Sequence, residues 1–403
     1  MVQRSPYTPG VVASTIYGRD QVLREAKREL FFMAHDPGLM GQVKVYVGPR
    51  GIGKTSLLRA VEAEAKAEGF ETAWITAGDR PLFNALLDKI GEIARSWKDE
   101  AGEKLLGLLS SLRVEAFGVS VGGSQPVEGP RPDASGYGDQ MQRALVDAAE
   151  TIRGRASGMV VCIDEIQSAD ADGLRSLAYA WQQMQAENAE LPLAIFAAGL
   201  SHSQDVITDA VSFAERFSYV HLESLDREHA EEALVQPAKK KGVNWSPATL
   251  QEAVRLAGGY PYFIQVVGDL VWQAADFPDP GTFIDLANLK HVADRFQETQ
   301  LTMFRSRWHK ATDVEREFIS AMAEDLEPQV KRGDIAERMG RPTTGISMVR
   351  RSLLDKGLIE ESGFGYLRFT VPGFAEFVRN ERGGQELEAR GGHFLPLYNY
   401  PNL

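Results

Sequence analysis

The chain has 403 residues, a formal net charge of −12 and a single cysteine, Cys162. This length accommodates two or three domains that each bury a core, and the acidic balance argues against a protein that coats nucleic acid non-specifically. One cysteine excludes a disulfide framework and a cysteine metal cluster. Because no apolar run could span a bilayer and the N-terminus lacks a secretion signal, we expect a cytoplasmic protein.

Residues 1–223 are predicted to form a nucleotide-binding core in which strands alternate with helices. A Pro-punctuated lead and a tight turn, Ile16-Tyr17-Gly18-Arg19-Asp20, precede a helix that extends through Phe32. The expected strands are Val43–Val47, Thr72–Thr76, Met159–Ile163, Leu193–Ala197 and Tyr219–Leu222. This alternation predicts an α/β fold, with a parallel sheet covered by helices on both faces.

A complete phosphate-loop pattern, G-x-x-x-x-G-K-[ST], follows the first expected strand. The pattern and the start of the next helix comprise Gly48, Pro49, Arg50, Gly51, Ile52, Gly53, Lys54, Thr55 and Ser56. In such a loop, backbone N–H groups and the positive end of the helix surround a polyphosphate. Lys54 is expected to reach the β- and γ-phosphates and Thr55 to offer its hydroxyl to Mg²⁺. The pattern predicts ATP or GTP binding.

An insertion at residues 77–157 separates the second and third expected strands. Helical patterns at 81–98 and 103–112 lead to a Gly/Pro-rich stretch, residues 118–138, which predicts a surface loop. The loop either binds a partner or serves only as a connection.

Two carboxylates, Asp164 and Glu165, end the third expected strand. Asp164 is expected to hold the Mg²⁺ shell and Glu165 to polarise the attacking water. The alternative for this pair taken alone is an ordinary solvated turn after a buried strand.

The remaining chain is divided into a helical lid at 224–281, a connecting helix within 282–311, a compact unit at 312–380 and a tail at 381–403. The compact unit has three helical patterns followed by a hairpin pattern, which is the order of a winged helix. Arg341, Arg350 and Arg351 lie in its basic stretch and are the predicted DNA contacts. The alternative is an internal packing module. The tail is either a frayed end or a peptide that docks on a neighbour.

Over about residues 5–380 the order of motifs resembles the AAA+ ATPases, in the branch that holds the origin-recognition initiators and the STAND-like ATPases. The resemblance implies ATP as the nucleotide, with Tyr17, Gly18 and Arg19 over the adenine. It implies that Arg216 is an arginine finger for a neighbouring subunit, and hence a homo-oligomer. The usual sensor asparagine is absent after the fourth strand, where Ser201 or His202 could substitute for it. In the lid, Pro261 stands where the initiators carry a sensor arginine, and its resemblance to the STAND switches implies that it packs near the nucleotide.

These features favour an oligomerising switch that hydrolyses ATP slowly and acts on double-stranded DNA in replication, transposition-like or mobile-element control. The alternative is a STAND-type signalling or defence ATPase whose winged helix packs internally and whose Gly/Pro loop or tail binds a protein. A third hypothesis, a degenerate nucleotide-binding scaffold, is disfavoured because Lys54, Thr55, Asp164 and Glu165 are all present.

Overall fold

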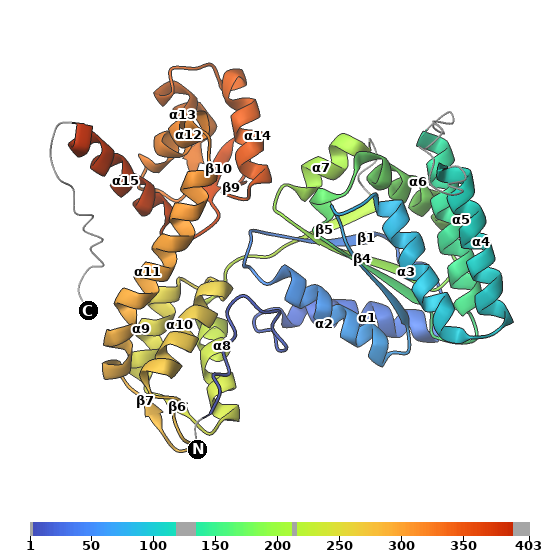
Figure 1. The fold of residues 1–403 in the computed structure, drawn as a ribbon, viewed down its shortest axis with the longest axis horizontal. Coiled ribbons are helices and arrows are strands. Elements are labelled where there is room, and N and C mark those ends of the chain that lie inside the picture. The colour runs from blue at the N-terminus through green and yellow to red at the C-terminus, as the bar shows by residue number, and fades with distance from the viewer. Residues whose placement is uncertain (1–2, 118–133, 212–215, 390–403) are drawn as a thin grey trace, which may run out of the picture. The chain divides into compact units, whose positions relative to one another are not determined.

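The computed structural model describes residues 3–117, 134–211 and 216–389, which form two compact units (Figure 1). The sheet unit comprises Arg19–Gly48 and Lys54–Leu222. The helical unit comprises the residues up to Gly18, the segment Pro49–Gly53 and the residues from Glu223 onward. No helix of the described ranges is long and apolar enough to cross a membrane.

A five-stranded parallel sheet forms the centre of the sheet unit, in the order β2-β3-β4-β1-β5. Every residue of β3 and β4 is buried, as expected for strands covered on both faces. The predicted parallel α/β core is therefore confirmed. The strands are β1 (Val43–Val47), β2 (Glu71–Thr76), β3 (Met159–Asp164), β4 (Leu193–Gly199) and β5 (Phe217–His221).

Helices cover both faces of this sheet, with α1 and α2 on one face and α6 and α7 on the other (Figure 1). Helix α5 packs along α6, and α4 packs against both α3 and α5. The elements are α1 (Asp20–His35), α2 (Lys54–Ala67), α3 (Leu82–Trp97), α4 (Glu100–Phe117), α5 (Ala134–Ile152), η1 (Ile166–Ser168), α6 (Ala171–Glu187) and α7 (Ser203–Ala210).

The predicted Gly/Pro-rich loop is wrong in its last part, because α5 begins at Ala134 and residues 134–138 are helical. The reason is tertiary packing. A Cβ added at Gly138 would lie 2.8 Å from the Cβ of Tyr179 on α6, so this glycine permits a close approach of two helices. Residues 118–133 lie outside the described ranges.

The helical unit begins with three helices, α8 (Arg227–Lys240), α9 (Pro247–Ala257) and α10 (Pro261–Ala274). The sequence predicts two of these helix starts, from Asp226 as an N-cap and from the pair Ser246-Pro247. Both are confirmed, since the side chain of Asp226 caps α8 and that of Ser246 caps α9. A short parallel pair, β6 (Asn244–Trp245) with β7 (Phe283–Ile284), was not predicted.

The N-terminal segment packs against these helices, although the sequence-based division assigned it to the core. The Tyr7 hydroxyl donates a hydrogen bond to the carbonyl of Leu234. The Tyr7 ring lies edge-on to the rings of Trp245 and Trp272. A Cβ added at Gly268 would lie 2.6 Å from the Tyr7 ring, so α10 is shaped around this side chain.

Helix α11 (Leu286–Lys310) leads into residues 312–380, here called the C-terminal module. The module has the predicted three helices and hairpin, together with a third strand, β8, that pairs with β10. The helix α15 continues to Ala389, so the first part of the predicted tail, residues 381–389, is helical. The rest of the predicted tail, from residue 390 on, lies outside the described ranges. The elements are α12 (Asp313–Ala323), β8 (Val330–Lys331), α13 (Arg332–Arg338), η3 (Thr343–Ile346), α14 (Ser347–Asp355), β9 (Ile359–Glu361), β10 (Tyr366–Phe369) and α15 (Phe374–Ala389).

Candidate functional site

The loop between β1 and α2 has the backbone that the phosphate-loop pattern predicts. Gly51 and Gly53 have φ angles of +81° and +97°, which side-chain-bearing residues rarely adopt. Gly48 at the start of the loop donates its N–H to the carbonyl of Gly199 at 3.2 Å, which ties the loop to the end of β4. Lys54 is the first residue of α2, at the positive end of the helix.

Thr55 and Asp164 meet directly, as the sequence predicted for an Mg²⁺ site. The Thr55 hydroxyl donates to Oδ2 of Asp164 at 2.9 Å, and the N–H of Glu165 donates to Oδ1 at 3.0 Å. Burial raises the pKa of Asp164, although these two hydrogen bonds oppose the effect. A hydroxyl beside a buried carboxylate is a donor set that suits Mg²⁺, and a cation there would offset the cost of burial.

Glu165 is held by a residue that the sequence reading missed, Gln167. The Gln167 amide nitrogen donates to Oε2 of Glu165, and its amide oxygen accepts the Leu200 N–H at 2.9 Å. Because that N–H can only donate, the amide oxygen must face Leu200 and the NH₂ group must face Glu165. The only sequence signal was a polar side chain two positions after the glutamate. Gln167 thus links Glu165 to the end of β4.

Gly18 and Pro261 lie close to other parts of the helical unit. A Cβ added at Gly18, which has φ of +65°, would lie 2.9 Å from side-chain atoms of His229 and Leu225. Pro261 is the first residue of α10 and follows the buried Tyr260, whose hydroxyl donates to the carbonyl of Arg50. The segment Pro49–Gly53 therefore contacts the residue next to Pro261.

Tyr17 and Arg19 flank this glycine turn. Tyr17 is half-buried, and burial followed by the charge of Glu232 raises its pKa. Arg19 is the residue before α1, and its carbonyl accepts the N–H of Leu23. Both remain predictions as adenine contacts.

Arg216 directly precedes β5, which begins two residues earlier than predicted. Its side chain is half-buried, and its Nε is buried without a hydrogen-bond partner among the described residues. Residues 212–215, which directly precede it, lie outside the described ranges. Within those ranges no hydrogen bond joins Arg216 to Lys54, Asp164 or Glu165.

The three predicted DNA contacts all form ion pairs within the C-terminal module. Arg341 pairs with Glu317 at 2.9 Å. On α14, Arg350 pairs with Glu361, and Arg351 pairs with Asp355 at 3.4 Å. These pairs reduce the local positive charge that the sequence suggested.

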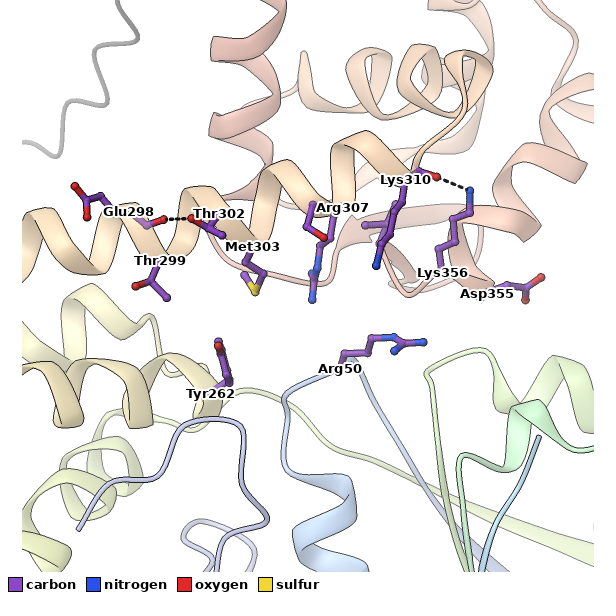
Figure 2. Close-up of a pocket in the computed structure, with 12 residues that line it drawn as sticks. Arg50, Tyr262, Glu298, Thr299, Thr302, Met303, Arg307, Lys310, Asp355 and Lys356 are labelled. Atoms are coloured by element: carbon purple, nitrogen blue, oxygen red, sulfur yellow. Dashed lines mark hydrogen bonds between the residues drawn. The ribbon is translucent and has the colours of Figure 1, made fainter. Parts of the chain in front are cut away.

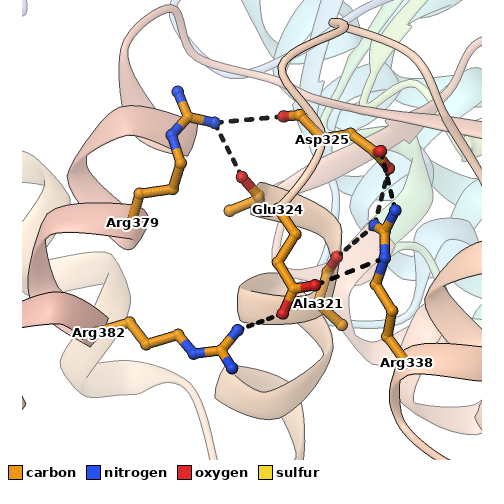
Figure 3. A network of polar contacts seen from close by, with 7 residues as sticks. Ala321, Glu324, Asp325, Arg338, Arg379 and Arg382 are labelled. Carbon is orange, nitrogen blue, oxygen red and sulfur yellow. Dashed lines mark hydrogen bonds and ion pairs between the residues drawn. The ribbon is translucent and has the colours of Figure 1, made fainter. Parts of the chain in front are cut away.

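Arg338, at the start of the same basic stretch, has an internal structural role. It donates to both oxygens of Asp325 at 2.8 Å and to the carbonyl of Ala321 at 2.8 Å (Figure 3). Figure 3 also shows Arg382 on Glu324 and Arg379 on the carbonyl of Asp325. These arginines fasten α13 and α15 to the end of α12.

Known proteins are similar to this chain in two separate regions. Residues 15–196 match the family model described as AAA ATPase domain, and residues 301–378 match one described as a domain of unknown function (DUF8462). The first match covers the phosphate loop and Asp164-Glu165. Residues 15–196 thus carry an AAA ATPase domain, a class of domain that hydrolyses ATP with Mg²⁺ as its cofactor.

Solved structures extend the likeness in fold beyond that domain. The ORC2 protein of Aeropyrum pernix, solved as ADPNP-ADP complexes, is 14% identical with a TM-score of 0.55, over 94% of this chain and 98% of that chain. Cdc6p of Pyrobaculum aerophilum is 16% identical with a TM-score of 0.47, over 94% of this chain and 98% of that chain. The chain therefore contains an AAA ATPase domain, and its fold is similar to that of the ORC2 protein.

A curated relative matches a shorter region. The polyribonucleotide nucleotidyltransferase of Saccharopolyspora erythraea is 29% identical over 141 residues, which is 32% of this chain. The match spans only 18% of that protein's length.

Proposed function

We propose that this ATPase is a slow switch in the cytoplasm that forms ATP-dependent homo-oligomers and acts on double-stranded DNA through its C-terminal module, which we interpret as a winged helix. The observation that carries the catalytic part of the proposal is the hydrogen bond from Thr55 to Asp164. It brings the end of the phosphate loop and the end of β3 into one site.

The residues of this site have separate roles in the proposed reaction. Lys54 and the loop N–H groups bind the β- and γ-phosphates, and Glu165 orients the attacking water. Mg²⁺, held by Thr55 and Asp164, would neutralise negative charge on the phosphates. Gln167 keeps one carboxylate oxygen of Glu165 in a fixed position.

The slow turnover follows from the residues that replace the usual sensors. His202 is buried at the start of α7, and the lid presents Pro261 where related initiators carry an arginine. Fewer charges are then available to stabilise the transition state, so we expect slow hydrolysis. We expect the main effect of ATP and ADP to be that each stabilises a different conformation.

Assembly is proposed from Arg216. Its unsatisfied, buried Nε marks a guanidinium whose hydrogen bonds are incomplete within the described part of one chain. A γ-phosphate supplied by a neighbouring subunit would complete them and would place positive charge where negative charge develops.

DNA action is proposed for the surface that carries Arg341, Arg350 and Arg351. At the turn between β9 and β10, Phe364 is 104% exposed. On α14, Met348 is 87% exposed beside the two arginines. Each arginine could exchange its carboxylate partner for a DNA phosphate, because partly exposed ion pairs contribute little stability.

Light scattering with ATP, ADP or no nucleotide, each with and without duplex DNA, tests the switch. We expect ATP to increase the assembled fraction and duplex to bind with a steep dependence on salt.

Lys54→Ala should lose ATP binding and Glu165→Gln should retain it while losing turnover. Arg350→Glu with Arg351→Glu should weaken duplex binding and lower its salt slope by about 2. ATP affinity unchanged by Lys54→Ala would refute the nucleotide site.

A second function, a STAND-type ATPase that engages a protein partner, is favoured by the charge of the C-terminal module. Acidic side chains outnumber basic ones across residues 312–380, and all three predicted DNA contacts are already paired. ATP-dependent assembly without any salt-sensitive duplex binding would select this function. The loop and tail that could bind such a partner lie outside the described ranges.

A further inference from the structure

A cavity of about 900 Å³ lies within the helical unit (Figure 2). One wall is a face of α11 from Glu298 to Lys310, and Tyr262 of α10 faces it. Arg50 and the segment 355–358 complete the lining. Arg50 belongs to the phosphate-loop pattern, but Lys54, Thr55 and Asp164 do not line this cavity.

Cations are concentrated at one end of the cavity. Arg50, Arg307 and Lys310 line it there, and none of them pairs with a carboxylate in the described ranges (Figure 2). Lys356 also lines this end, but its ammonium group is held by Glu315 at 2.8 Å. The two carboxylates of the lining, Glu298 and Asp355, leave a net positive charge in an otherwise acidic protein.

Arg307 is the least satisfied of these cations. Its Nη1 is buried without a hydrogen-bond partner in the part of the chain that the structure describes. Burial lowers the pKa of Arg307; the Tyr260 hydroxyl opposes that effect, and the nearby charge of Arg50 adds to it. Two neighbouring guanidinium groups with an unused buried N–H are stabilised by an anion between them.

The other surfaces of the cavity suit the rest of a nucleotide. Tyr262 and Met303 offer a flat ring and an apolar side chain, on which a base can stack. Thr299, Thr302 and Ser306 add hydroxyl groups to the lining. The volume lies within the usual range for small-molecule sites.

We propose that this cavity binds a nucleoside phosphate, either free or as part of a nucleic-acid strand, with Arg50, Arg307 and Lys310 on the phosphate. In the occupied site, Nη1 of Arg307 donates a hydrogen bond to the phosphate. In the empty site this buried Nη1 has no partner in the described part of the chain. The site goes beyond the proposed ATP switch and does not require that the ATP site hydrolyse its substrate.

Calorimetric titration with inorganic pyrophosphate tests the phosphate part of the site. The full chain carries Lys54→Ala, which weakens binding at the ATP site. We expect Arg307→Gln to weaken pyrophosphate binding in this background by about tenfold or more, because a charge-assisted hydrogen bond is lost. Arg305→Gln, an exposed arginine on the same helix that does not line the cavity, should leave the affinity unchanged. Equal affinities in the three proteins, or no binding to any of them, would overturn the proposal.

A second variant tests the site without changing the half-buried Arg307, whose substitution could impair folding. Lys310→Gln removes an exposed cation from the rim and should weaken pyrophosphate binding with no change in the thermal unfolding midpoint. Unchanged pyrophosphate affinity in Lys310→Gln would show that this lysine does not contact the phosphate, and it would contradict the proposed site.

Competition against bound pyrophosphate distinguishes the two sources of the phosphate. Displacement by ATP alone identifies a free nucleotide, and displacement by a short single-stranded oligodeoxythymidylate identifies a nucleic-acid strand. Displacement by neither ligand would overturn the nucleoside part of the proposal.

Discussion

At the scale of single residues, Gln167 fixes the carboxylate of Glu165 through an amide that can face only one way. Its oxygen is committed to the N–H of Leu200, so its NH₂ group must serve Glu165. A Cβ added at Gly199 would lie 2.8 Å from the Gln167 oxygen, so the glycine at the end of β4 makes room for this link. The motif residues could be predicted from the sequence because their spacing is characteristic. Gln167 could not, because its partner lies 33 residues away in the chain.

Replacing Gln167 with glutamate should reverse this contact. In Gln167→Glu a carboxylate oxygen faces Glu165, so the two repel and the attacking water loses its orientation. We expect kcat for ATP hydrolysis to fall about tenfold, with KM changed by less than about threefold, because phosphate binding uses other residues. Steady-state phosphate release measures both. Gln182→Glu, an exposed position on α6, is the matched control; a kcat in Gln167→Glu equal to that of the control would contradict the positioning role.

At the scale of secondary-structure elements, the sequence predicted most strands and the starts of the capped helices. These features depend on short-range signals, such as an apolar run or a serine before a proline. It did not predict the start of α5, because Gly138 serves a contact with Tyr179 on another helix. It also missed β8, a two-residue strand that exists only by pairing with β10.

Helices α12 and α14 are joined through a buried carboxylate, Glu315, which is 3% exposed. It accepts hydrogen bonds from the N–H of Thr312 at 2.7 Å, the hydroxyl of Ser352 at 2.6 Å and the ammonium of Lys356 at 2.8 Å. Burial opposes ionisation, but these hydrogen bonds outweigh it and lower the pKa of Glu315 to about 2. The carboxylate therefore binds α14 to the start of α12.

This depressed pKa predicts how the stability of the C-terminal module depends on pH. Because the folded-state pKa lies below the unfolded one, the stabilisation is complete above about pH 5 and is lost as pH falls toward 2. Glu315→Gln should cost up to about 3 kcal/mol at pH 7 and progressively less below pH 4.5. Urea unfolding at several pH values measures this difference. Glu327→Gln, an exposed position, should show no such trend; a pH-independent cost in Glu315→Gln would refute the assignment.

At the scale of the whole molecule, the fold class followed from the alternation of strands and helices, whereas the placement of the segment Pro49–Gly53 did not. The segment Pro49–Gly53 lies inside the phosphate-loop pattern, yet its contacts place it in the helical unit. No local pattern carries that information, because the contact of Arg50 is with Tyr260, 210 residues further along the chain. Assembly into an oligomer likewise depends on contacts between chains, which the sequence of one chain does not specify directly.

If Arg216 serves a neighbouring subunit, two inactive variants should restore activity when mixed. Glu165→Gln lacks the water-orienting group but keeps the finger, and Arg216→Ala has the opposite defect. An interface that combines the intact Glu165 of one subunit with the intact Arg216 of the next is complete. We expect phosphate release from the mixture to exceed that of either variant alone by about tenfold. A mixture no more active than its components would exclude an intermolecular role for Arg216.

The position of Tyr7 has a consequence for the order in which this protein can be built on the ribosome. Tyr7 emerges among the first residues, but its partners Leu234 and Trp245 follow 227 and 238 residues later. Gln3 waits still longer, since its carbonyl accepts the indole N–H of Trp272, 269 residues away. The nascent N-terminus must stay unburied while the sheet unit is translated, and its docking is among the last events of folding.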